Sequence, residues 1–350
     1  MKNLVLITSI LIIVLALQAC GSSSKKSPTP TTPTTPTTPT TPPTTPTLPE
    51  AVHHIQPEDV ARYVENYQSQ QAAVELQIDG AIYKVTFVDM SQSDNLIFAQ
   101  YDKGFLFFGF DFENNQPVDF IRVVETELED INEALADADN YFFGKDISLS
   151  QDDNENATYE GSISHPVKGD FSIKLTVNES LIEGGTSTVE VSGTIAMVNG
   201  DLGTKTYVQI TDLINNHPEV DTLLLQEISG SVNDAINMHT GRLVRNAQLT
   251  TMVEATSDVN SGGVDLYTSG FKRVYTEGAK LGVHSWCCTE GKPADELGRD
   301  HEGHGAQLTF FREMLGAELG PEFYFFTIEA APHNTVHVMT KAELDKYLLQ

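Results

Sequence analysis

The sequence predicts an α+β, β-rich domain over residues 51–192, followed by an α/β domain over residues 193–350. Two observations predict this division. In the first half, runs such as "FSIKLTV" alternate apolar and polar residues, which is typical of antiparallel strands with one face in water. In the second half, segments with helical apolar spacing alternate with short continuous apolar runs. That alternation favours βαβ units and a mostly parallel sheet.

The expected elements of the first half are mainly strands. A helical stretch opens at Pro57-Glu58 and extends to about Gln71, and one amphipathic helix is expected near Phe120 to Ala136. Apolar or alternating runs from "AVELQI" to "STVEVSGTIAMV" predict strands between turn residues. This half shows neither a nucleophile motif nor a cluster of residues at metal-ligand spacing. We therefore interpret it as a binding or spacing domain of unknown function.

The second half alternates strands and helices. The runs "VDTLLLQEI" and "LTTMVEA" predict buried strands, and the segments "SVNDAINMHTGRLVRNA" and "GGVDLYTSG" that follow them predict helices. The runs "FKRVYT" and "KLGVHSW" are expected to be further strands. In sheets of this type, ligands bind beyond the carboxyl ends of the strands. The loops that follow these strands are therefore where a functional site is expected.

Residues 1–19 predict a signal peptide. A short basic start precedes an apolar run from Leu4 to Leu17, which is shorter than the roughly 20 residues that a membrane-spanning helix needs. The ending "LQAC" resembles the lipobox of bacterial lipoproteins. The resemblance implies cleavage before Cys20, lipid including palmitate on that residue, and anchoring in a membrane of the cell envelope. An ordinary secretory signal with a chance cysteine is the alternative.

Residues 20–50 predict a tether rather than a domain. Nine of the sixteen prolines lie in the Thr/Pro-rich run between residues 28 and 49. Such chains extend as polyproline II, at about 3.1 Å per residue, and cannot form a core. Gly21, rather than aspartate, after the expected lipidated cysteine indicates the outer membrane, facing the periplasm or the cell surface. The tether would hold the folded domains away from that membrane.

The net charge of −28 limits the partners. No basic patch of any length occurs, which argues against nucleic acid and against anionic lipid. No cofactor is expected. Of the three cysteines, Cys20 is assigned to lipid, and two adjacent cysteines, Cys287-Cys288, rarely bond each other, so no disulfide scaffold is expected.

The residues around the two adjacent cysteines include types that can bind a metal. His284, Cys287, Cys288, His301 and His304 lie within 21 residues, and cysteine and histidine are zinc ligands. The cysteines lack the two-residue gap that structural zinc sites prefer, and "HEGH" is not the HExxH motif. We therefore expect no metal at these residues.

The expected loops contain the components of an acyl-transfer site. Gly230 lies in the loop after "TLLLQE", Ser261 and Gly262 follow the next strand, and His284 follows "KLGV". The first amides of a helix have no partner inside it, so glycine N–H groups there can stabilise an oxyanion. A hydroxyl, two such donors and an imidazole together predict a serine nucleophile with a histidine base.

These residues also carry a resemblance to a known family. The stretch from "ISGSVNDAINMHTGRL" to "KLGVHSW" resembles the ClpP/crotonase superfamily, and is most similar to the periplasmic ClpP-like proteins of bacteria. The resemblance covers about Gly193 to Leu349, and its specificity lies in the order and spacing of the motifs. The motifs are, in order, the "SGSV" loop in place of the family's Gly-Gly loop, Ser261 at the start of the central helix, "SG" followed by a basic pair, and "LGVH". The tail "VMTKAELDKYLL" resembles the family's closing helix.

The resemblance implies a ClpP/crotonase-like domain with serine hydrolase or peptidase activity on a peptide or acyl substrate. Carried over by position, Ser261 is the nucleophile, His284 its general base, and the N–H groups of Gly230 and Gly262 form the oxyanion hole. The family's third member is an acid, but "PHNTVH" at that place has no carboxylate. Asn334 is the candidate that would orient the histidine, and a difference of one or two residues in the matched position leaves His333 and Thr335 open. The resemblance also implies assembly into rings or other homo-oligomers.

Simpler interpretations stand beside this one. Ser261 could be only the N-cap of a helix, the commonest role of serine at such a position. Asp258 and Asp265 are expected to be solvated or capping residues. The rival function is a catalytically inactive ClpP-like binding or assembly lipoprotein, which keeps the fold after losing its acid.

Overall fold

The computed structural model describes residues 48–49, 52–91, 93–112, 114, 116–128, 131–136, 140–153, 156–178 and 180–349. The predicted signal peptide, Cys20 and nearly all of the predicted linker lie outside the described residues. No helix among the described residues is long and apolar enough to cross a membrane.

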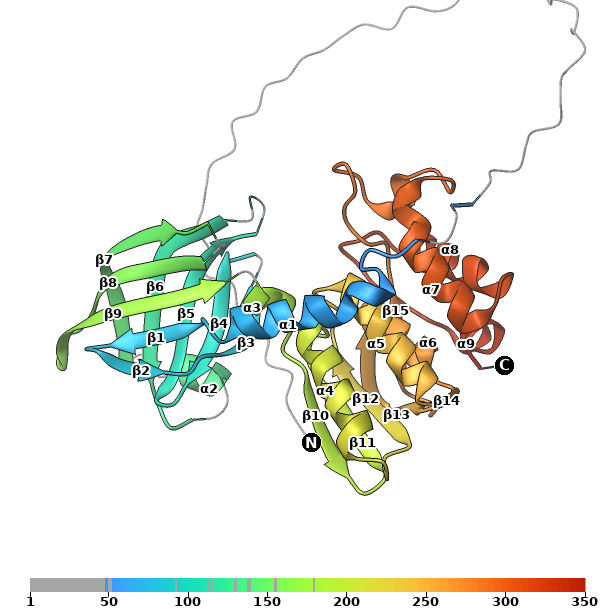
Figure 1. The fold of residues 1–350 in the computed structure, drawn as a ribbon, viewed down its shortest axis with the longest axis horizontal. Helices are drawn as coiled ribbons and strands as arrows, with labels where there is room; N and C mark the ends of the chain where they lie inside the picture. The colour runs from blue at the N-terminus through green and yellow to red at the C-terminus, as the bar shows by residue number, and fades with distance from the viewer. Residues whose placement is uncertain are drawn as a thin grey trace, which may run out of the picture. The chain divides into compact units, whose positions relative to one another are not determined.

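The first half forms an antiparallel sheet of nine strands (Figure 1), in the order β2-β1-β9-β8-β7-β6-β5-β4-β3. The strands are β1 Glu75–Ile78, β2 Ala81–Tyr83, β3 Thr86–Ser91, β4 Leu96–Tyr101, β5 Gly104–Asp111, β6 Gln116–Glu125, β7 Tyr141–Gln151, β8 Asn156–His165 and β9 Gly169–Asn178. Their inward side chains form one apolar cluster, and the hydroxyl of the buried Tyr159 donates a hydrogen bond to Gly109 O (2.7 Å). The expected β-rich domain is therefore present as an antiparallel sheet.

The helices of this half are few and short. They are the 3₁₀ turn η1 Pro57–Asp59, α1 Val60–Gln71, α2 Ile131–Ala136 and α3 Ser180–Glu183. The helix expected from Phe120 to Ala136 is therefore wrong over its first part, which is strand β6. Ile121, Val123 and Val124 are buried there, and pairing with β5 stabilises this segment as a strand.

The second half forms a mostly parallel sheet, as predicted. Its strands are β10 Thr188–Ser192, β11 Ile195–Asn199, β12 Thr222–Ile228, β13 Thr250–Asn260, β14 Lys272–Tyr275, β15 Lys280–Val283 and β16 His337–Val338. The order is β10-β11-β12-β13-β15-β16, with β14 paired to β13 as well. Strands β11, β12, β13, β14 and β15 run parallel to one another, and β10 and β16 join the sheet antiparallel. Strand β10, from the run "STVEVSG", thus belongs to this sheet.

Six α-helices accompany the second sheet in the described residues (Figure 1): α4 Thr204–Asn216, α5 Asp234–Asn246, α6 Gly262–Ser269, α7 Gly305–Leu315, α8 Leu319–Ala330 and α9 Lys341–Tyr347, with the 3₁₀ turns η3 Ala294–Glu296 and η4 Glu302–His304. Their buried apolar side chains form a second cluster, separate from that of the first sheet. Helices α5 and α7 approach closely at Gly241, where a Cβ would lie 2.8 Å from the ring of Phe310.

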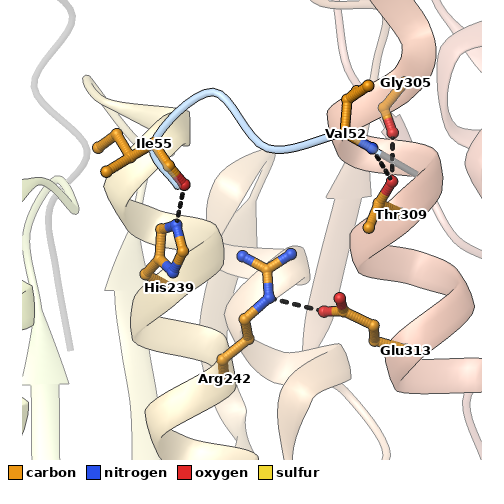
Figure 2. Close-up of polar contacts among 7 residues, drawn as sticks. All are labelled: Val52, Ile55, His239, Arg242, Gly305, Thr309 and Glu313. Carbon is orange, nitrogen blue, oxygen red and sulfur yellow. Dashed lines mark hydrogen bonds and ion pairs between the residues drawn. The ribbon is translucent and has the colours of Figure 1, made fainter. Parts of the chain in front are cut away.

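A short segment before η1, residues Val52–Ile55, lies across α5 and α7, and we call it the N-terminal strap (Figure 2). Val52 N–H donates to Thr309 Oγ1 (3.0 Å) on α7, and His239 Nε2 on α5 bonds the carbonyl oxygen of Ile55 (2.8 Å). Because a carbonyl oxygen only accepts, Nε2 of His239 carries the hydrogen. Burial lowers the pKa of His239, so the ring is held neutral beneath the strap.

The two helices under the strap are also joined directly. Arg242 Nε on α5 donates to Glu313 Oε2 on α7 (2.6 Å), as Figure 2 shows. Thr309 Oγ1, which accepts from the strap, donates in turn to Gly305 O one turn earlier (2.7 Å). The N-terminal strap is therefore fixed to the helices of the second sheet by hydrogen bonds.

The adjacent cysteines differ from the expectation. Cys287 and Cys288 are bonded to each other as a disulfide, across a cis peptide bond that brings their Cα atoms to 3.0 Å. Both lie exposed in the loop after β15. The expectation rested on how rarely neighbouring cysteines bond each other.

Candidate functional site

The pairing of β13 with β15 brings Ser261 and His284 to the same end of the sheet. The strands are parallel, with Asn260 opposite Gly282, and Ser261 N–H donates to Gly282 O (2.8 Å). Ser261 directly follows β13, and His284 directly follows β15. Because the carboxyl ends of parallel strands lie at one edge, two residues that are 23 positions apart in the sequence line one cavity.

Ser261 has an unusual backbone conformation. Its φ is 51° and its ψ is −125°, a region that side-chain-bearing residues adopt at a cost of about 1–3 kcal/mol. Its side chain makes no capping hydrogen bond to α6. A serine on a strained strand-to-helix turn, with its hydroxyl free of the helix, is the arrangement of a nucleophile elbow. The N-cap interpretation therefore does not explain this residue.

Two glycines leave their backbone close to the serine. A Cβ at Gly230 would lie 3.2 Å from Ser261 Cβ and 3.6 Å from its Oγ, and a Cβ at Gly262 would collide with the Ser231 hydroxyl. The loop after β12 and the start of α6 are thus in contact. Gly262 opens α6, so its N–H has no partner inside the helix. Among the hydrogen bonds of the described residues, none engages the N–H of Gly230. Both amides are therefore available to an oxyanion at Ser261.

The imidazole of His284 is held in one tautomer. Its Nδ1 lies 2.7 Å from the carbonyl oxygen of Ser285. That oxygen can only accept, so Nδ1 carries the hydrogen and Nε2 of the neutral ring has the free lone pair of a base. Ser285 is itself fully buried and fixed, since its N–H donates to Ala331 O (2.8 Å) and its Oγ accepts from Asp295 N–H (3.1 Å).

Ser261 and His284 open into a small cavity between helices. Its volume is about 40 Å³, room for a few water-sized groups, so a reacting carbonyl would fill it. No hydrogen bond joins Ser261 Oγ to the imidazole among the described residues, and such bonds commonly form only when substrate is bound. The cavity is lined by Asp234, Ser261, Gly262, Asp265, Val283, His284, Trp286, Gln307, Phe311, Tyr324, Thr327 and Ile328.

One wall of the cavity is aromatic and rigid. The hydroxyl of Tyr324 accepts a hydrogen bond from Trp286 Nε1 (2.9 Å) and bonds Nδ1 of the buried His304 (2.7 Å). Burial raises the pKa of Tyr324, so this hydroxyl stays neutral. A group bound at Ser261 would meet a wall that keeps its shape.

Two aspartates in this cavity are functional candidates that the sequence did not reveal. Burial raises the pKa of Asp265 well above its usual range, and the nearby Asp234 raises it further. Burial also raises the pKa of Asp234, opposed by a hydrogen bond from Ser231 and by the charges of His284 and His54. Asp265 was expected to be solvated or capping, and it instead lies half-buried in the wall of the cavity. The two carboxyl groups lie near each other because α5 packs against α6, and the sequence pattern does not contain that packing.

Asn334 is not placed with the other predicted residues. It lies exposed in the loop between α8 and β16, and it is not among the residues that line the cavity. The imidazole nitrogen that Asn334 would orient bonds the Ser285 carbonyl instead. Ser261, His284, Gly230 and Gly262 are thus brought together, whereas Asn334 is not.

The residues considered for zinc do not converge in the structure. Among the described residues, no group of three or more histidine, cysteine, aspartate or glutamate side chains is arranged to hold a metal ion. His301 Nδ1 accepts from Gly303 N–H (3.1 Å), and His304 bonds Tyr324, so both act within the fold.

Comparison with known proteins gives weak similarities only. No model of a protein family matches the sequence, and no curated protein matches it significantly. Among solved structures, an enoyl-CoA hydratase from Bacillus anthracis is 12% identical, covering 47% of this chain and 67% of that chain with a TM-score of 0.31. A membrane-bound stomatin-specific protease, solved as a mutant with a substrate peptide, is 14% identical, covering 44% and 71% with a TM-score of 0.33.

A monofunctional enoyl-CoA isomerase from M. smegmatis is also similar, with 12% identity, coverage of 47% of this chain and 74% of that chain, and a TM-score of 0.29. At TM-scores near 0.3 the similarity is weak. The case for a function therefore rests on the residues of the cavity.

The strain at Ser261 is measurable as stability. The free energy of unfolding of Ser261→Gly is expected to be about 1 kcal/mol larger than that of Ser261→Ala. Glycine relieves a backbone strain of roughly 1–3 kcal/mol, whereas its greater freedom in the unfolded chain costs about 0.5–1 kcal/mol. Urea unfolding of both variants measures the difference. The same pair at Ser162, in strand β8, is the control and should show the reverse order. Equal stability of the two Ser261 variants would contradict the strained backbone.

The raised pKa of Asp265 predicts a pH-dependent stability. The folded state binds this proton more tightly than the unfolded chain, so the cost of ionising Asp265 is absent below about pH 4 and grows as the pH rises towards its folded pKa. Asp265→Asn should therefore raise the free energy of unfolding near neutral pH, and the gain should shrink as the pH falls. Asp258→Asn is the matched control, because the hydrogen bond from Lys280 lowers the pKa of Asp258. Removing that carboxylate should lower the free energy of unfolding near neutral pH. Urea unfolding across this pH range measures both, and a gain for Asp265→Asn that does not depend on pH would rule out the shift.

Proposed function

We propose that this protein is a membrane-anchored envelope lipoprotein whose second domain is a serine hydrolase or peptidase acting by acyl transfer. The observation that carries the proposal is Ser261, a serine in a strained turn with no capping bond, in one cavity with a histidine base and beside two glycine amides. Strain at a residue whose side chain makes no capping hydrogen bond is best explained by a functional requirement.

The proposed reaction follows from these positions. Ser261 Oγ attacks the carbonyl carbon of the substrate, and its proton passes to Nε2 of His284. The N–H groups of Gly230 and Gly262 bind the oxyanion that forms. The leaving group departs with the proton from His284, and the acyl group stays on Ser261. Water then attacks the acyl-enzyme, His284 takes its proton, and the acid product is released as Ser261 regains its hydrogen.

The reaction is tested with a fluorophosphonate probe on the full chain in detergent micelles. We expect covalent labelling that Ser261→Ala abolishes and that His284→Gln slows by about 100-fold or more, the usual range for a lost general base. Ser269→Ala is the control, because Ser269 is buried in α6 and bonds Leu266 O. Mass spectrometry of the labelled peptide identifies the site. A folded protein that is never labelled would favour the rival, a binding or assembly lipoprotein without catalytic activity.

The anchoring part of the proposal rests on the sequence "LQAC" and the tether after it. In bacterial cells given a fatty acid with an alkyne tag, the protein should become labelled, and Cys20→Ala should abolish the label. The double variant Cys287→Ser/Cys288→Ser is the control for lipid attached to another cysteine, and it should keep the label. Labelling that survives Cys20→Ala would refute the assignment.

A further inference from the structure

The proposed mechanism lacks a charged group that would stabilise His284 once it has accepted a proton. Serine hydrolases commonly use a carboxylate for this purpose. Asn334 is exposed and outside the cavity, and the Ser285 carbonyl that holds Nδ1 carries no charge. The sequence places no acid near Asn334 to take that part. The missing charge must therefore come from another element, if it is present.

The cavity itself supplies two carboxyl groups. Asp234 lies in the first turn of α5 and Asp265 in the first turn of α6, and both line the cavity with His284. No lysine or arginine is among the lining residues in the described part of the chain. Two carboxylates without a cation repel each other in a poorly solvated cavity, so the pair is expected to share one negative charge.

The contacts of the two groups differ. The Ser231 hydroxyl donates to Asp234 Oδ1, whereas no hydrogen bond reaches the Asp265 carboxyl group among those of the described residues. The charges of His284, which follows β15, and of the exposed His54 in the N-terminal strap also act on Asp234, while Tyr324 of α8 is a neutral neighbour of both aspartates. A hydrogen-bond donor and two imidazoles favour the ionised form of Asp234 over that of Asp265.

Asp234 is also held in place. The preceding residue, Asn233, caps α5 by accepting from Ile236 N–H (3.3 Å), and its amide donates to the hydroxyl of Tyr63 on α1 (2.7 Å). The Tyr63 hydroxyl donates in turn to Glu183 (2.8 Å). The start of α5 is thus fixed from outside the cavity, and the Asp234 carboxylate keeps its position relative to His284.

We propose that Asp234 is the charged partner of His284, acting across the cavity as a positioning residue, and that Asp265 is the neutral hydrogen-bond donor of the same cavity. The inference rests on the proposed acyl-transfer function. No hydrogen bond joins Asp234 to the imidazole, so Asp234 acts through its charge, while the Ser285 carbonyl fixes the ring. Asp265 would donate its hydrogen to a substrate oxygen or to the leaving group.

The charge on Asp234 is tested without any activity, by NMR titration of the His284 ring in the full chain in micelles. The signal is assigned by its loss in His284→Gln. In Asp234→Asn the titration midpoint should move to lower pH by about one unit, because an imidazolium beside a lost negative charge is less stable. Asp234→Glu should restore the midpoint, and Asp258→Asn, a carboxylate outside the cavity, should leave it unchanged. An unmoved midpoint in folded Asp234→Asn overturns the proposal, and so does a shift in Asn334→Ala instead.

A second measurement tests the proposal even if Asp234→Asn does not fold. The infrared C=O stretch of a protonated carboxyl group should be present near neutral pH and should disappear in Asp265→Asn. A band that persists in that variant would place the proton on another carboxyl group and overturn the assignment. Both measurements are independent of labelling by the fluorophosphonate. If the wild type is never labelled, the proposed function fails. The NMR and infrared measurements would still decide which aspartate carries the charge.

The kinetic consequence separates a positioning role from a merely structural one. Where the wild type is labelled, Asp234→Asn should slow the labelling rate at its plateau by about tenfold or more and move the acid limb of its pH profile to lower pH by about one unit. Asp234→Glu should recover the position of the limb. A slower rate with an unchanged limb would assign Asp234 to the fold alone and overturn the inference.

Discussion

The register between β13 and β15 is the constraint on which the candidate site depends. Asn260 lies opposite Gly282, and the hydrogen bond from Ser261 N–H to Gly282 O continues that pairing by one residue. A slip of one residue would turn every side chain of β15 to the opposite face. Ser261 and His284 could then no longer line one cavity. The register of the sheet therefore sets the positions of the two residues of the candidate site.

The same pairing explains why glycine, which has no side chain, occupies positions 230 and 262. With Ser261 held at the end of β13, the loop after β12 passes so close that a Cβ at Gly230 would touch its side chain. A Cβ at Gly262 would strike Ser231, the residue that donates to Asp234. The two glycines therefore have two effects. They bring free amides to the serine, and they let the carboxylate and its donor lie beside it.

Much of this arrangement could be predicted from the sequence, and the failures have physical causes. The order of strands and helices placed Ser261 and His284 at one edge of the sheet, because that edge follows from parallel strands alone. The two aspartates of the cavity could not be found in this way. Asp234 and His284 are separated by 50 positions and line one cavity through the packing of α5, which no local pattern encodes. The helix expected across Ile121 failed similarly, since cross-strand pairing outweighed helical spacing.

The features that sequence reasoning handled worst are those that oppose stability. A serine at positive φ and two carboxyl groups in a cavity without a cation each cost the folded state free energy. An ordinary helix start would have a capping side chain and solvated acids, as was expected for Asp265. A fold whose other elements agree with its sequence tolerates such departures where they are useful. That three of them lie around one cavity, beside a histidine whose base nitrogen is free, is a stronger argument for chemistry there than any one residue type.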